Sequence, residues 1–418
     1  MLVSQEEPKR NQTQSTLLSE GAYGCIFKPG YTCQGKIEKK NYITKIQKKG
    51  PNSENELEIG KKIRKIKNFE LYFSPILKNC NLSMTNLINN HKETKECSII
   101  EQEKQKQEQN KSEEEEEDNF QANRIRYILG KTMGETIEIK IQEYNYYQQT
   151  NNQNQNQNQN QNHPFYFLLE NHKYLLQSLS KLQKRKIIHY DLKQNNIMFD
   201  NQNNIPIIID FGISISTQKI DAINPDIKTL KNYFYNDSEY LAWTLDTMFI
   251  SNLAISNHQH QHQHQQQNQQ QQQPSWQTQP INPIQYQQRI DSFLNESKLF
   301  KENQIRLLSN LFPKESPLQA QIRNFQNNTK TTWENYLQTT LKPKTQLEFF
   351  QTLWENRNTW DTYALSTMFL FFISNLPKPN NQKTTTLMEN YVKINIENIQ
   401  SLPNFRKTPL KMLKELSK

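Results

Sequence analysis

Cysteine is scarce in this chain of 418 residues, which contains only Cys25, Cys33, Cys80 and Cys97. Four cysteines are too few for a disulfide framework over this length, and no two have the C-x-x-C spacing that is typical of a zinc site. We therefore expect reduced thiols, as in a cytosolic or nuclear protein.

Long apolar runs are also lacking. The first ten residues, MLVSQEEPKR, contain no apolar core of a secretory signal, and the longest apolar run, around Tyr363–Leu376, is short and interrupted by polar residues. A bilayer-spanning helix needs about 20 mostly apolar residues. We expect a soluble intracellular protein, cytoplasmic or nuclear, with no membrane partner.

Hydrophobic residues make up only 34% of the chain, and the mean hydropathy is -0.95. The low average hides dense apolar segments such as Ile205–Ile209 and Met368–Ile373, which are able to form a packed interior. The length alone would suggest two or three domains, but polar low-complexity sequence inflates it.

Three low-complexity tracts account for that inflation. They are acidic and Gln-rich at about 101–118, Asn/Gln-rich at about 148–162, and His/Gln-rich at about 256–280. None can bury enough apolar surface to offset its chain entropy, so we expect disordered insertions. Without them, residues 15–418 approach the size of a single domain.

The net charge of +9 comes from dispersed Lys and Arg residues. A basic balance of this size suits nucleic acid, anionic membranes or phosphate-rich substrates, but we favour a solvated lysine-rich surface over dedicated nucleic-acid binding. A nucleic-acid-binding protein would need a platform of aromatic and basic side chains, and the sequence shows none. We do not expect a nucleic-acid partner.

The hydrophobic periodicity predicts an α+β protein with two unequal parts. The smaller part, about 15–132, reads as β-rich with one main helix, at Asn55–Ile66, and the larger part, about 133–418, reads as mostly helical. The remaining predicted elements are strands within 15–48 including Tyr42–Ile46, a strand at Arg124–Leu129, a long helix at Phe165–Leu182, short buried strands at Ile187–Ile188, Ile197–Phe199 and Ile207–Ile209, and helices from about Asn282 onward.

Two segments near the middle of the chain carry residues suited to phosphoryl transfer: HYDLKQNN at 189–196 and IIIDFG at 207–212. That reaction needs metal ligands, a neutralising cation and a carboxylate that orients the attacking hydroxyl. Asn196 and Asp210 offer the oxygen atoms that Mg²⁺ prefers. Asp191 is able to accept the substrate proton, and Lys193 to lie against the transferred phosphate.

The combination of H-x-D-L-K-x-x-N with I-D-F-G, the second aspartate fourteen residues after the asparagine, resembles a eukaryotic-type protein kinase. The resemblance implies a bilobal protein-kinase-like fold, Mg-ATP as the phosphate donor and a protein substrate. The D-L-K lysine is the pattern of serine/threonine kinases. GAYGCIFKPG, HYDLK and the absence of A-P-E resemble the divergent protein kinases of large DNA viruses.

The resemblance also implies a nucleotide-binding hairpin and a strand lysine upstream. SEGAYGCI at 19–26 matches G-x-G-x-x-G-x-V at Gly21, Gly24 and, at the last position, Ile26, with Ser19 in place of the first glycine. Lys45, at the end of YITK, would contact the nucleotide phosphates and pair with a helix carboxylate.

Three glutamates compete for the pairing with Lys45. Glu56 has apolar residues three and seven positions further on, whereas Glu58 has lysines at those positions. We therefore expect Glu56 rather than Glu54 or Glu58 to pair with Lys45. The alternative is that all three acids only decorate the N-terminus of the helix, where the helix dipole favours them.

Further matches are weaker. Residues 129–134 fall where the hinge between lobes would lie. WDTYALS at 360–366 resembles the start of the central helix of the larger lobe, and its Asp361 would hydrogen-bond the catalytic-loop backbone. NFRKT at 404–408 resembles the element whose arginine pairs with the glutamate of A-P-E. Asp246 is the nearest stand-in for that glutamate.

Tyr190 replaces the arginine of H-R-D, which in protein kinases binds a phosphate on the activation segment. Tyrosine lacks the bidentate cation, so we hypothesise an enzyme that is constitutively competent or regulated elsewhere. Loss of activity on replacing Ser214, Ser216 and Thr217 by alanine, with recovery through acidic mimics, would contradict this hypothesis.

Three other functions compete with a protein kinase. A pseudokinase scaffold would usually have lost the strand lysine or one of the catalytic and metal aspartates, but Lys45, Asp191, Asn196 and Asp210 are all present. A small-molecule phosphotransferase usually lacks the D-L-K lysine and the Phe-Gly after the metal aspartate. The third is the nucleic-acid-associated protein considered above. The sequence does not predict the substrate or the oligomeric state.

Overall fold

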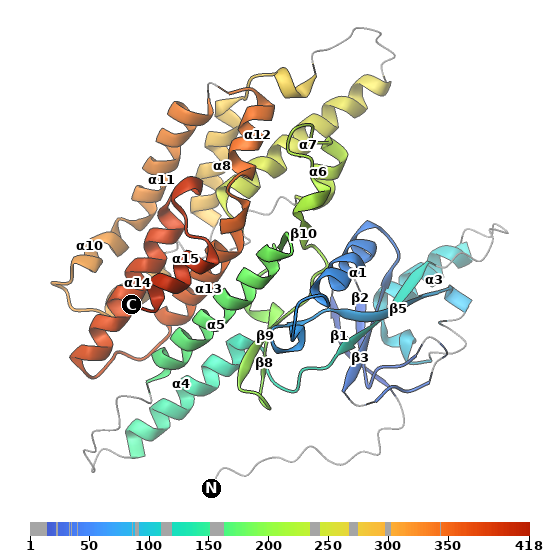
Figure 1. Cartoon of the computed structure of the whole chain (residues 1–418), viewed down its shortest axis with the longest axis horizontal. Coiled ribbons are helices and arrows are strands. Elements are labelled where there is room, and N and C mark those ends of the chain that lie inside the picture. Colours follow the sequence, from blue (N-terminus) through green and yellow to red (C-terminus); the bar gives the residue numbers. More distant parts are fainter. Residues whose placement is uncertain are drawn as a thin grey trace. The chain divides into compact units, whose positions relative to one another are not determined.

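The structure is a computed structural model that describes two compact units of the chain (Figure 1). The N-terminal unit comprises described residues up to 70 and from 74 to 129, and the C-terminal unit comprises residues 71–73 and described residues from 130 onward. The described residues are 15–21, 24–32, 34, 36–39, 41–85, 87, 92–109, 119–150, 163–234, 243–266, 275–296, 302–342 and 344–418.

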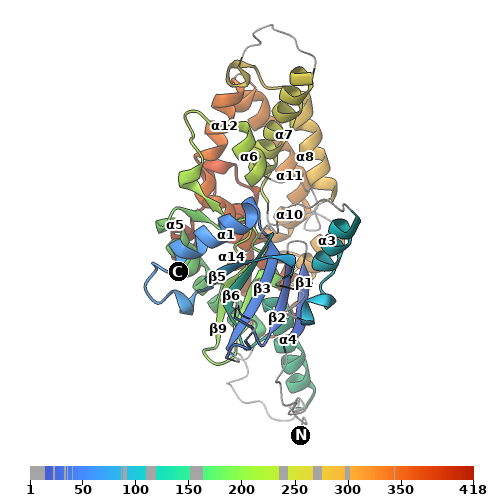
Figure 2. The same cartoon turned by 90° about the vertical axis from the view of Figure 1, so that its right-hand side faces the viewer.

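The N-terminal unit is built on a five-stranded antiparallel sheet in the order β1-β2-β3-β6-β5 (Figure 2). Its strands are β1 (Thr16–Gly21), β2 (Gly24–Lys28), β3 (Tyr42–Lys48), β5 (Ile76–Leu82) and β6 (Phe120–Arg126), and its helices are α1 (Pro51–Ile63), α3 (Ser98–Gln109) and the short turn η2 (Lys92–Glu96).

The two faces of this sheet differ in character. One face carries an apolar cluster that includes Cys25, Phe27, Ile46 and Phe120, packed with Ile100 of α3. Because side chains alternate along a strand, the residues between them belong to the opposite face. There Lys45 lies between Ile26 of β2 and Asn123 of β6 in the strand register. The sheet therefore places Lys45 on its more polar face.

Helix α1 begins at Pro51, a residue that suits the first helical turn because that turn needs no N–H from it. Ile59 and Ile63 recur at a spacing of four and are fully buried, which places Glu56 on the buried face with them. Gly60 permits a close approach to β5: a Cβ at this position would lie 3.0 Å from the carbonyl oxygen of Ile76.

The expectation of reduced thiols was wrong. Cys25 of β2 forms a disulfide with Cys97, which precedes α3, and Cys80 is also disulfide-bonded. Among the described residues there is no free cysteine. The pairing depends on the fold, which brings together two residues separated by 72 positions, and sequence spacing alone did not indicate it. Since stable disulfides are typical of oxidising compartments, the cysteines give no support to a cytosolic or nuclear location.

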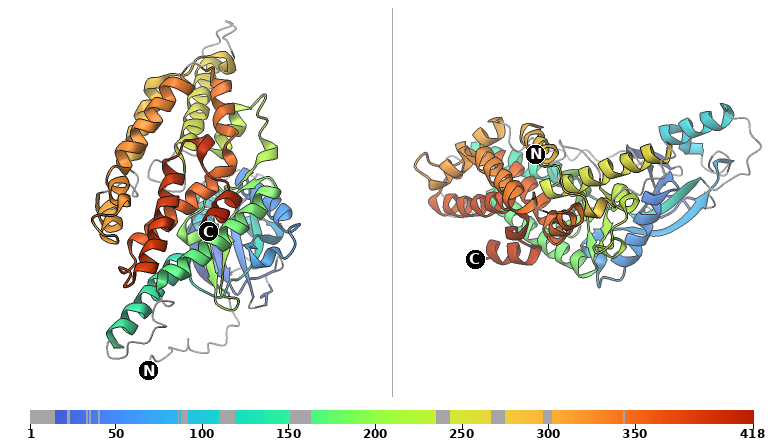
Figure 3. Two further views of the ribbon diagram at one scale, coloured as in Figure 1. Left: turned by 60° about the vertical axis from the view of Figure 1, so that its left-hand side comes forward. Right: turned by 90° about the horizontal axis from the view of Figure 1, so that it is seen from above.

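The C-terminal unit is mostly helical (Figures 1 and 3). It carries two small sheets, in the orders β4-β9-β8 and β10-β7. Its strands are β4 (Phe73–Ser74), at the junction of the two sequence ranges, β7 (Ile187–Ile188), β8 (Ile197–Asp200), β9 (Ile205–Ile209) and β10 (Ile215–Ser216). Its helices are α4 (Met133–Thr150), α5 (Pro164–Lys184), α6 (Ile227–Tyr233), α7 (Leu245–Gln266), α8 (Pro283–Glu296), α9 (Glu302–Asn310), α10 (Pro317–Arg323), α11 (Phe325–Tyr336), α12 (Gln346–Trp354), α13 (Trp360–Ser374), α14 (Gln382–Gln400) and α15 (Pro409–Leu416). The remaining short elements of the described residues are the turns η1 (Phe69–Leu71), η4 (Gln194–Asn196), η5 (Thr217–Lys219), η6 (Trp276–Thr278), η9 (Arg357–Thr359) and η10 (Pro403–Phe405), and the single-turn π-helix η8 (Leu337–Leu341).

Helices α5 and α13 form the centre of this unit. The predicted leucine stripe of α5 is buried, from Leu168 to Leu182, and α5 packs against α13 and α15. Helix α13 is buried on nearly all sides, which explains its lack of a polar face. Among the described residues, none of the helices has both the length and the apolar character required to cross a bilayer.

The mixed α+β architecture, with a small sheet-based N-terminal unit and a larger helical C-terminal unit, agrees with the sequence prediction. The division falls between Leu129 and Gly130, close to the expected 132/133. Gly130 is required at this point because a Cβ there would lie 1.7 Å from the carbonyl oxygen of Phe199.

The predicted insertions were partly wrong, because helices continue into all three tracts. Residues 101–109 belong to α3, 148–150 to α4 and 256–266 to α7, and residues 275–280 include η6. Glu, Lys and Gln have good helix propensity, and extending an existing helix avoids the cost of nucleation. Residues 110–118, 151–162 and 267–274 lie outside the described residues.

Candidate functional site

The predicted nucleotide-binding hairpin is formed by β1 and β2. Gly21 lies opposite Gly24 in the strand register, and Ala22 and Tyr23 between them are outside the described residues. Gly24 is sterically required: a Cβ there would lie 2.3 Å from the carbonyl oxygen of Ile46. Gly21 has open space around it. The two glycines therefore differ, one serving packing and the other leaving the backbone accessible.

Lys45 of β3 pairs with Glu56 of α1, as the helix spacing predicted. The Lys45 Nζ lies 3.0 Å from Glu56 Oε2 and 3.2 Å from Oε1, and both residues are buried. Glu54 is exposed, and Glu58 pairs instead with Lys62 at 3.6 Å. The lysine head is thus fixed by a charge-assisted hydrogen-bonded pair rather than left to rotate.

Gln47, two positions after Lys45 on the same face of β3, was not anticipated. Its side-chain Nε2 donates to Glu56 Oε2 at 3.2 Å, so the carboxylate of Glu56 is held from two positions of one strand. Gln47 is buried, as are Gln121 and Asn123 of β6. A glutamine at position 47 of β3, where a buried strand usually has an apolar residue, was the sequence signal that could have indicated the contact with Glu56.

In the C-terminal unit, the loop after β7 is anchored by Asp361 at the start of α13. Asp361 Oδ2 accepts from the backbone N–H of His189 at 2.8 Å, and Oδ1 accepts from that of Tyr190 at 3.0 Å. The predicted supporting role of Asp361 is confirmed. Burial raises the pKa of Asp361 to about 6, an effect that the two N–H donors oppose by stabilising the charged form.

Three predicted residues, Asp191, Lys193 and Asn196, meet on this loop. The side-chain Nδ2 of Asn196 donates to Asp191 Oδ2 at 2.7 Å and to the Asp191 carbonyl at 2.8 Å, while Lys193 Nζ lies 3.3 Å from Asp191 Oδ1. Burial raises the pKa of Asp191 to about 6, against the opposing charge of Lys193. Asp191 is consequently a carboxylate at neutral pH and a stronger base than an exposed aspartate.

Asp210 follows β9 and is close enough for its charge to contribute to the raised pKa of Asp191. Its backbone has a φ of 58°, a left-handed conformation that few non-glycine residues adopt, and its side chain is exposed. Asn196 uses its amide nitrogen for Asp191, so its amide oxygen is the atom that could coordinate a cation. Asn196 and Asp210 together therefore offer oxygen ligands of the kind that Mg²⁺ prefers.

His189 links the two segments that carry Asp191 and Asp210. Its Nδ1 accepts from the backbone N–H of Asp191 at 3.3 Å, so its Nε2 carries the proton and donates to the Ile209 carbonyl at 3.0 Å. Complete burial lowers the pKa of His189 to about 4, so the ring is neutral at physiological pH. The histidine acts as a structural bridge and not as a titrating group.

The weak match of NFRKT at 404–408, with Asp246 in place of the A-P-E glutamate, also corresponds to a contact in the structure. Arg406 Nη2 lies 2.7 Å from Asp246 Oδ1, and the other carboxylate oxygen accepts from the indole N–H of Trp360 at 2.5 Å. Asp246, near the start of α7, therefore occupies the position of the carboxylate expected to pair with the late arginine. Trp360 directly precedes Asp361, so this contact borders the anchor of the loop.

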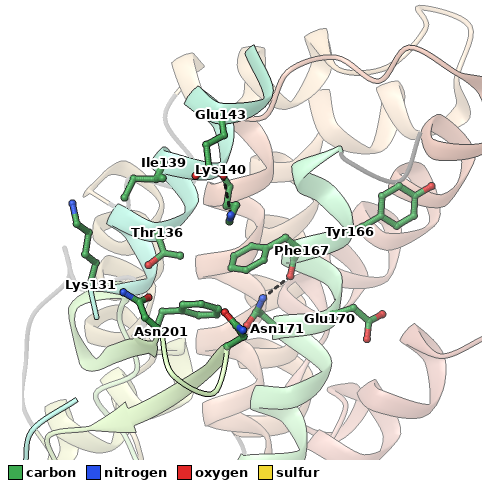
Figure 4. A pocket seen from close by; sticks show the side chains of 12 residues that line it. Lys131, Thr136, Ile139, Lys140, Glu143, Tyr166, Phe167, Glu170, Asn171 and Asn201 are labelled. Carbon is green, nitrogen blue, oxygen red and sulfur yellow. Dashed lines mark hydrogen bonds and ion pairs between the residues drawn. The ribbon is translucent and has the colours of Figure 1, made fainter. Parts of the chain in front are cut away.

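A separate cavity of about 710 Å³ lies between α4, α5 and the β8–β9 hairpin (Figure 4). Ile139, Phe167 and Phe199 supply apolar lining, and the remaining lining side chains are lysine, glutamate, asparagine, threonine and tyrosine. None of the predicted site residues lines it. The sequence did not predict this cavity, because its lining comes from three separate elements and no single motif marks it.

Two comparisons with known proteins returned nothing: no family model matches the sequence, and no curated protein sequence matches it.

Proposed function

We propose that this protein is an ATP-dependent serine/threonine protein kinase with a bilobal kinase-like fold, the N-terminal and C-terminal units being its two lobes. The observation that carries the proposal is the grouping of Asp191, Lys193 and Asn196 on a loop whose backbone is anchored by Asp361. Asp191, Lys193 and Asn196 each suit one role in phosphoryl transfer. The hydrogen bonds of Asp361 to the backbone of His189 and Tyr190 hold this loop from a distant part of the chain.

The proposed role of Asp191 is to orient the substrate hydroxyl and accept its proton. The carboxylate is held by Asn196 on one oxygen and faces Lys193 on the other, so its orientation is restricted. Its pKa of about 6 keeps it ionised at neutral pH while making it basic enough for proton transfer. Lys193, close to Asp191 and partly exposed, suits contact with the transferred phosphate.

The residues present fit a Mg²⁺ ion bound with the nucleotide. Asn196 and the exposed carboxylate of Asp210 are the two oxygen donors that would hold it, and both belong to the C-terminal unit. When bound, the cation would neutralise charge on the phosphate oxygens. The left-handed backbone at Asp210 supports this role, since such conformations cluster at functional sites.

The proposed role of the N-terminal unit is to bind the nucleotide. Lys45 would contact its phosphates, with Glu56 and Gln47 fixing the lysine, and Gly21 leaves the hairpin backbone open to phosphate oxygens. Ile26, beside Lys45 in the register, would supply apolar contact to the base. An intracellular location stays a prediction without support from the cysteines.

A phosphotransfer assay tests the proposal. Purified protein is incubated with labelled Mg-ATP and a generic basic protein, beside Asp191→Asn and Asp210→Ala variants. We expect transfer by the wild-type chain and at least a hundredfold less by each variant. Nucleotide binding without transfer would indicate a pseudokinase instead, and transfer only to small alcohols or aminoglycosides would indicate a small-molecule phosphotransferase.

A further inference from the structure

Tyr190, directly before Asp191, is held at both of its peptide groups. Its N–H donates to Asp361 Oδ1 at 3.0 Å, and its carbonyl accepts from the indole N–H of Trp243 at 2.9 Å. Its φ of 68° is a left-handed conformation that is strained for a bulky residue, so surrounding contacts must maintain it. Trp243 is separated from Tyr190 by 53 positions and supplies one of these contacts.

Aromatic packing adds to the hydrogen bond. The ring of Tyr190 stacks on Trp243 with centroids 5.3 Å apart and planes at 22°, and it meets Phe234 edge to face at 5.8 Å. All three side chains are buried. Tyr190, which replaces the H-R-D arginine, therefore anchors Trp243, two residues before α7, through ring packing and not through a charge.

The hydroxyls nearest this loop are poorly placed to receive a phosphate. Ser214 and Ser216 are completely buried, and Ser214 Oγ donates to the His189 carbonyl at 3.0 Å. Thr217 is half-buried and directs its hydroxyl to the Lys186 carbonyl at 3.3 Å. These hydroxyls already take part in the packing and hydrogen bonding around the loop in the unmodified chain.

We propose that Trp243 is a positioning residue for the reaction at Asp191, and that its stack on Tyr190 fixes the catalytic loop without phosphorylation. The inference rests on the proposed kinase function. Trp243 touches no reacting atom: it acts through the Tyr190 carbonyl, one peptide group away from Asp191. The structure supplies by an indole N–H and a ring stack what a phosphate-bound arginine would otherwise supply.

The test compares Trp243→Phe with Trp333→Phe. The first variant removes the indole N–H but keeps an aromatic ring beside Tyr190. The second makes the same chemical change in a buried tryptophan of α11 that packs against Phe249 and Tyr336. We expect Trp243→Phe to lower kcat about tenfold, the effect of losing one hydrogen bond from the positioned loop, with KM for ATP unchanged. Trp333→Phe should leave both constants unchanged.

Two outcomes of this comparison would contradict a positioning role while leaving the kinase proposal intact: equal kcat values for the two variants, or a Trp243→Phe variant that changes only KM for ATP. Absence of transfer by the wild-type chain itself would instead refute the proposed function.

Phosphate independence is tested on the wild-type chain. After phosphatase treatment, confirmed by intact mass, we expect undiminished initial rates. A rate that falls with dephosphorylation and returns as phosphate is regained would overturn the inference. If Trp243→Phe does not fold, hydrogen exchange of the wild-type chain provides a second test. Peptides over 187–196 of the unphosphorylated protein should exchange slowly. Rapid exchange there would contradict the proposal.

Discussion

Arg406 and Asp246 form an ion pair from which water is excluded, with 2.7 Å between Nη2 and Oδ1 and side-chain exposures of 1% and 0%. The contact joins the segment before α15 to the start of α7. The guanidinium also lies over the ring of Tyr363 at 5.8 Å. The pair thus connects three helices of the C-terminal unit around the base of α13.

Removing one partner of this pair should strongly destabilise the C-terminal unit. We expect Arg406→Met to lower the free energy of unfolding by about 3–5 kcal/mol, because Asp246 would keep a buried, uncompensated charge. The double variant Arg406→Met/Asp246→Asn should recover part of the loss. All five tryptophans lie at positions 243–360, so urea unfolding followed by tryptophan fluorescence reports this unit. Lys330→Met, at the exposed Lys330–Asp291 pair, is the control and should cause no measurable change.

Neutralising Glu56 should impair catalysis, whereas neutralising Glu54 should not. Glu56→Gln keeps the shape of the side chain but removes the charge that pairs with Lys45, and we expect kcat/KM for ATP to fall about 10–100-fold. Glu54→Gln changes an exposed residue in the first turn of the same helix and is the matched control. Equal effects of the two substitutions would contradict a role of the Lys45–Glu56 pair in the proposed reaction.

The rate should depend on pH through Asp191. Burial raises its pKa to about 6, and the ionised form is the base, so kcat at saturating Mg-ATP should fall tenfold per pH unit below about 6 and level off above it. Lys193 lowers this pKa by its charge, so Lys193→Met should move the acidic limb to higher pH while also reducing the rate. A flat profile between pH 5 and 8 would argue against Asp191 as the base.

The two hairpin glycines should respond differently to alanine. A Cβ at Gly24 would lie 2.3 Å from the Ile46 carbonyl oxygen, so β2 and β3 must separate, at a cost of about 1–3 kcal/mol. Gly21→Ala enters open space and should change stability by less than about 0.5 kcal/mol. Hydrogen exchange of peptides over β2 and β3 measures both. A Gly24→Ala variant as stable as the wild type would contradict the close approach.

Loss of the Cys25–Cys97 disulfide should destabilise the N-terminal unit. Closing a loop of this length reduces the entropy of the unfolded chain, which corresponds to about 4 kcal/mol. Cys25→Ala/Cys97→Ala should therefore lower protection in β2, β3 and α1, again read by hydrogen exchange. Treating the wild-type chain with a dithiol should lower protection at least as much, because it also reduces the disulfide of Cys80. No change in the double variant would contradict a structural role of the Cys25–Cys97 disulfide.

Local patterns predicted those parts of the site that depend on one element. The burial of Ile59 and Ile63 follows from a spacing of four, and their positions three and seven after Glu56, compared with the pattern of protein kinases, selected it from three glutamates. The leucine stripe of α5 followed from the same reasoning. The motif around Asp191 also implied that Asp361 would support the loop, which the contacts to His189 and Tyr190 confirm.

Features that depend on distant parts of the chain were beyond the sequence. The Cys25–Cys97 pairing requires β2 and the start of α3 to meet, and no periodicity encodes that meeting. The contact of Trp243 with Tyr190 joins a segment after β10 to the loop that carries Asp191. Helix α7 continues into the His/Gln tract although the tract has no apolar stripe, so composition alone misled.

The disulfide turns residues 25–97 into a covalent ring, and both Lys45 and Glu56 lie inside it. If the backbone were cut once between these two residues, the disulfide would still join the two resulting fragments covalently. The strand that carries the lysine and the helix that carries the glutamate would therefore remain at a high effective concentration toward each other. A nicked N-terminal unit should retain its ion pair until its disulfides are reduced.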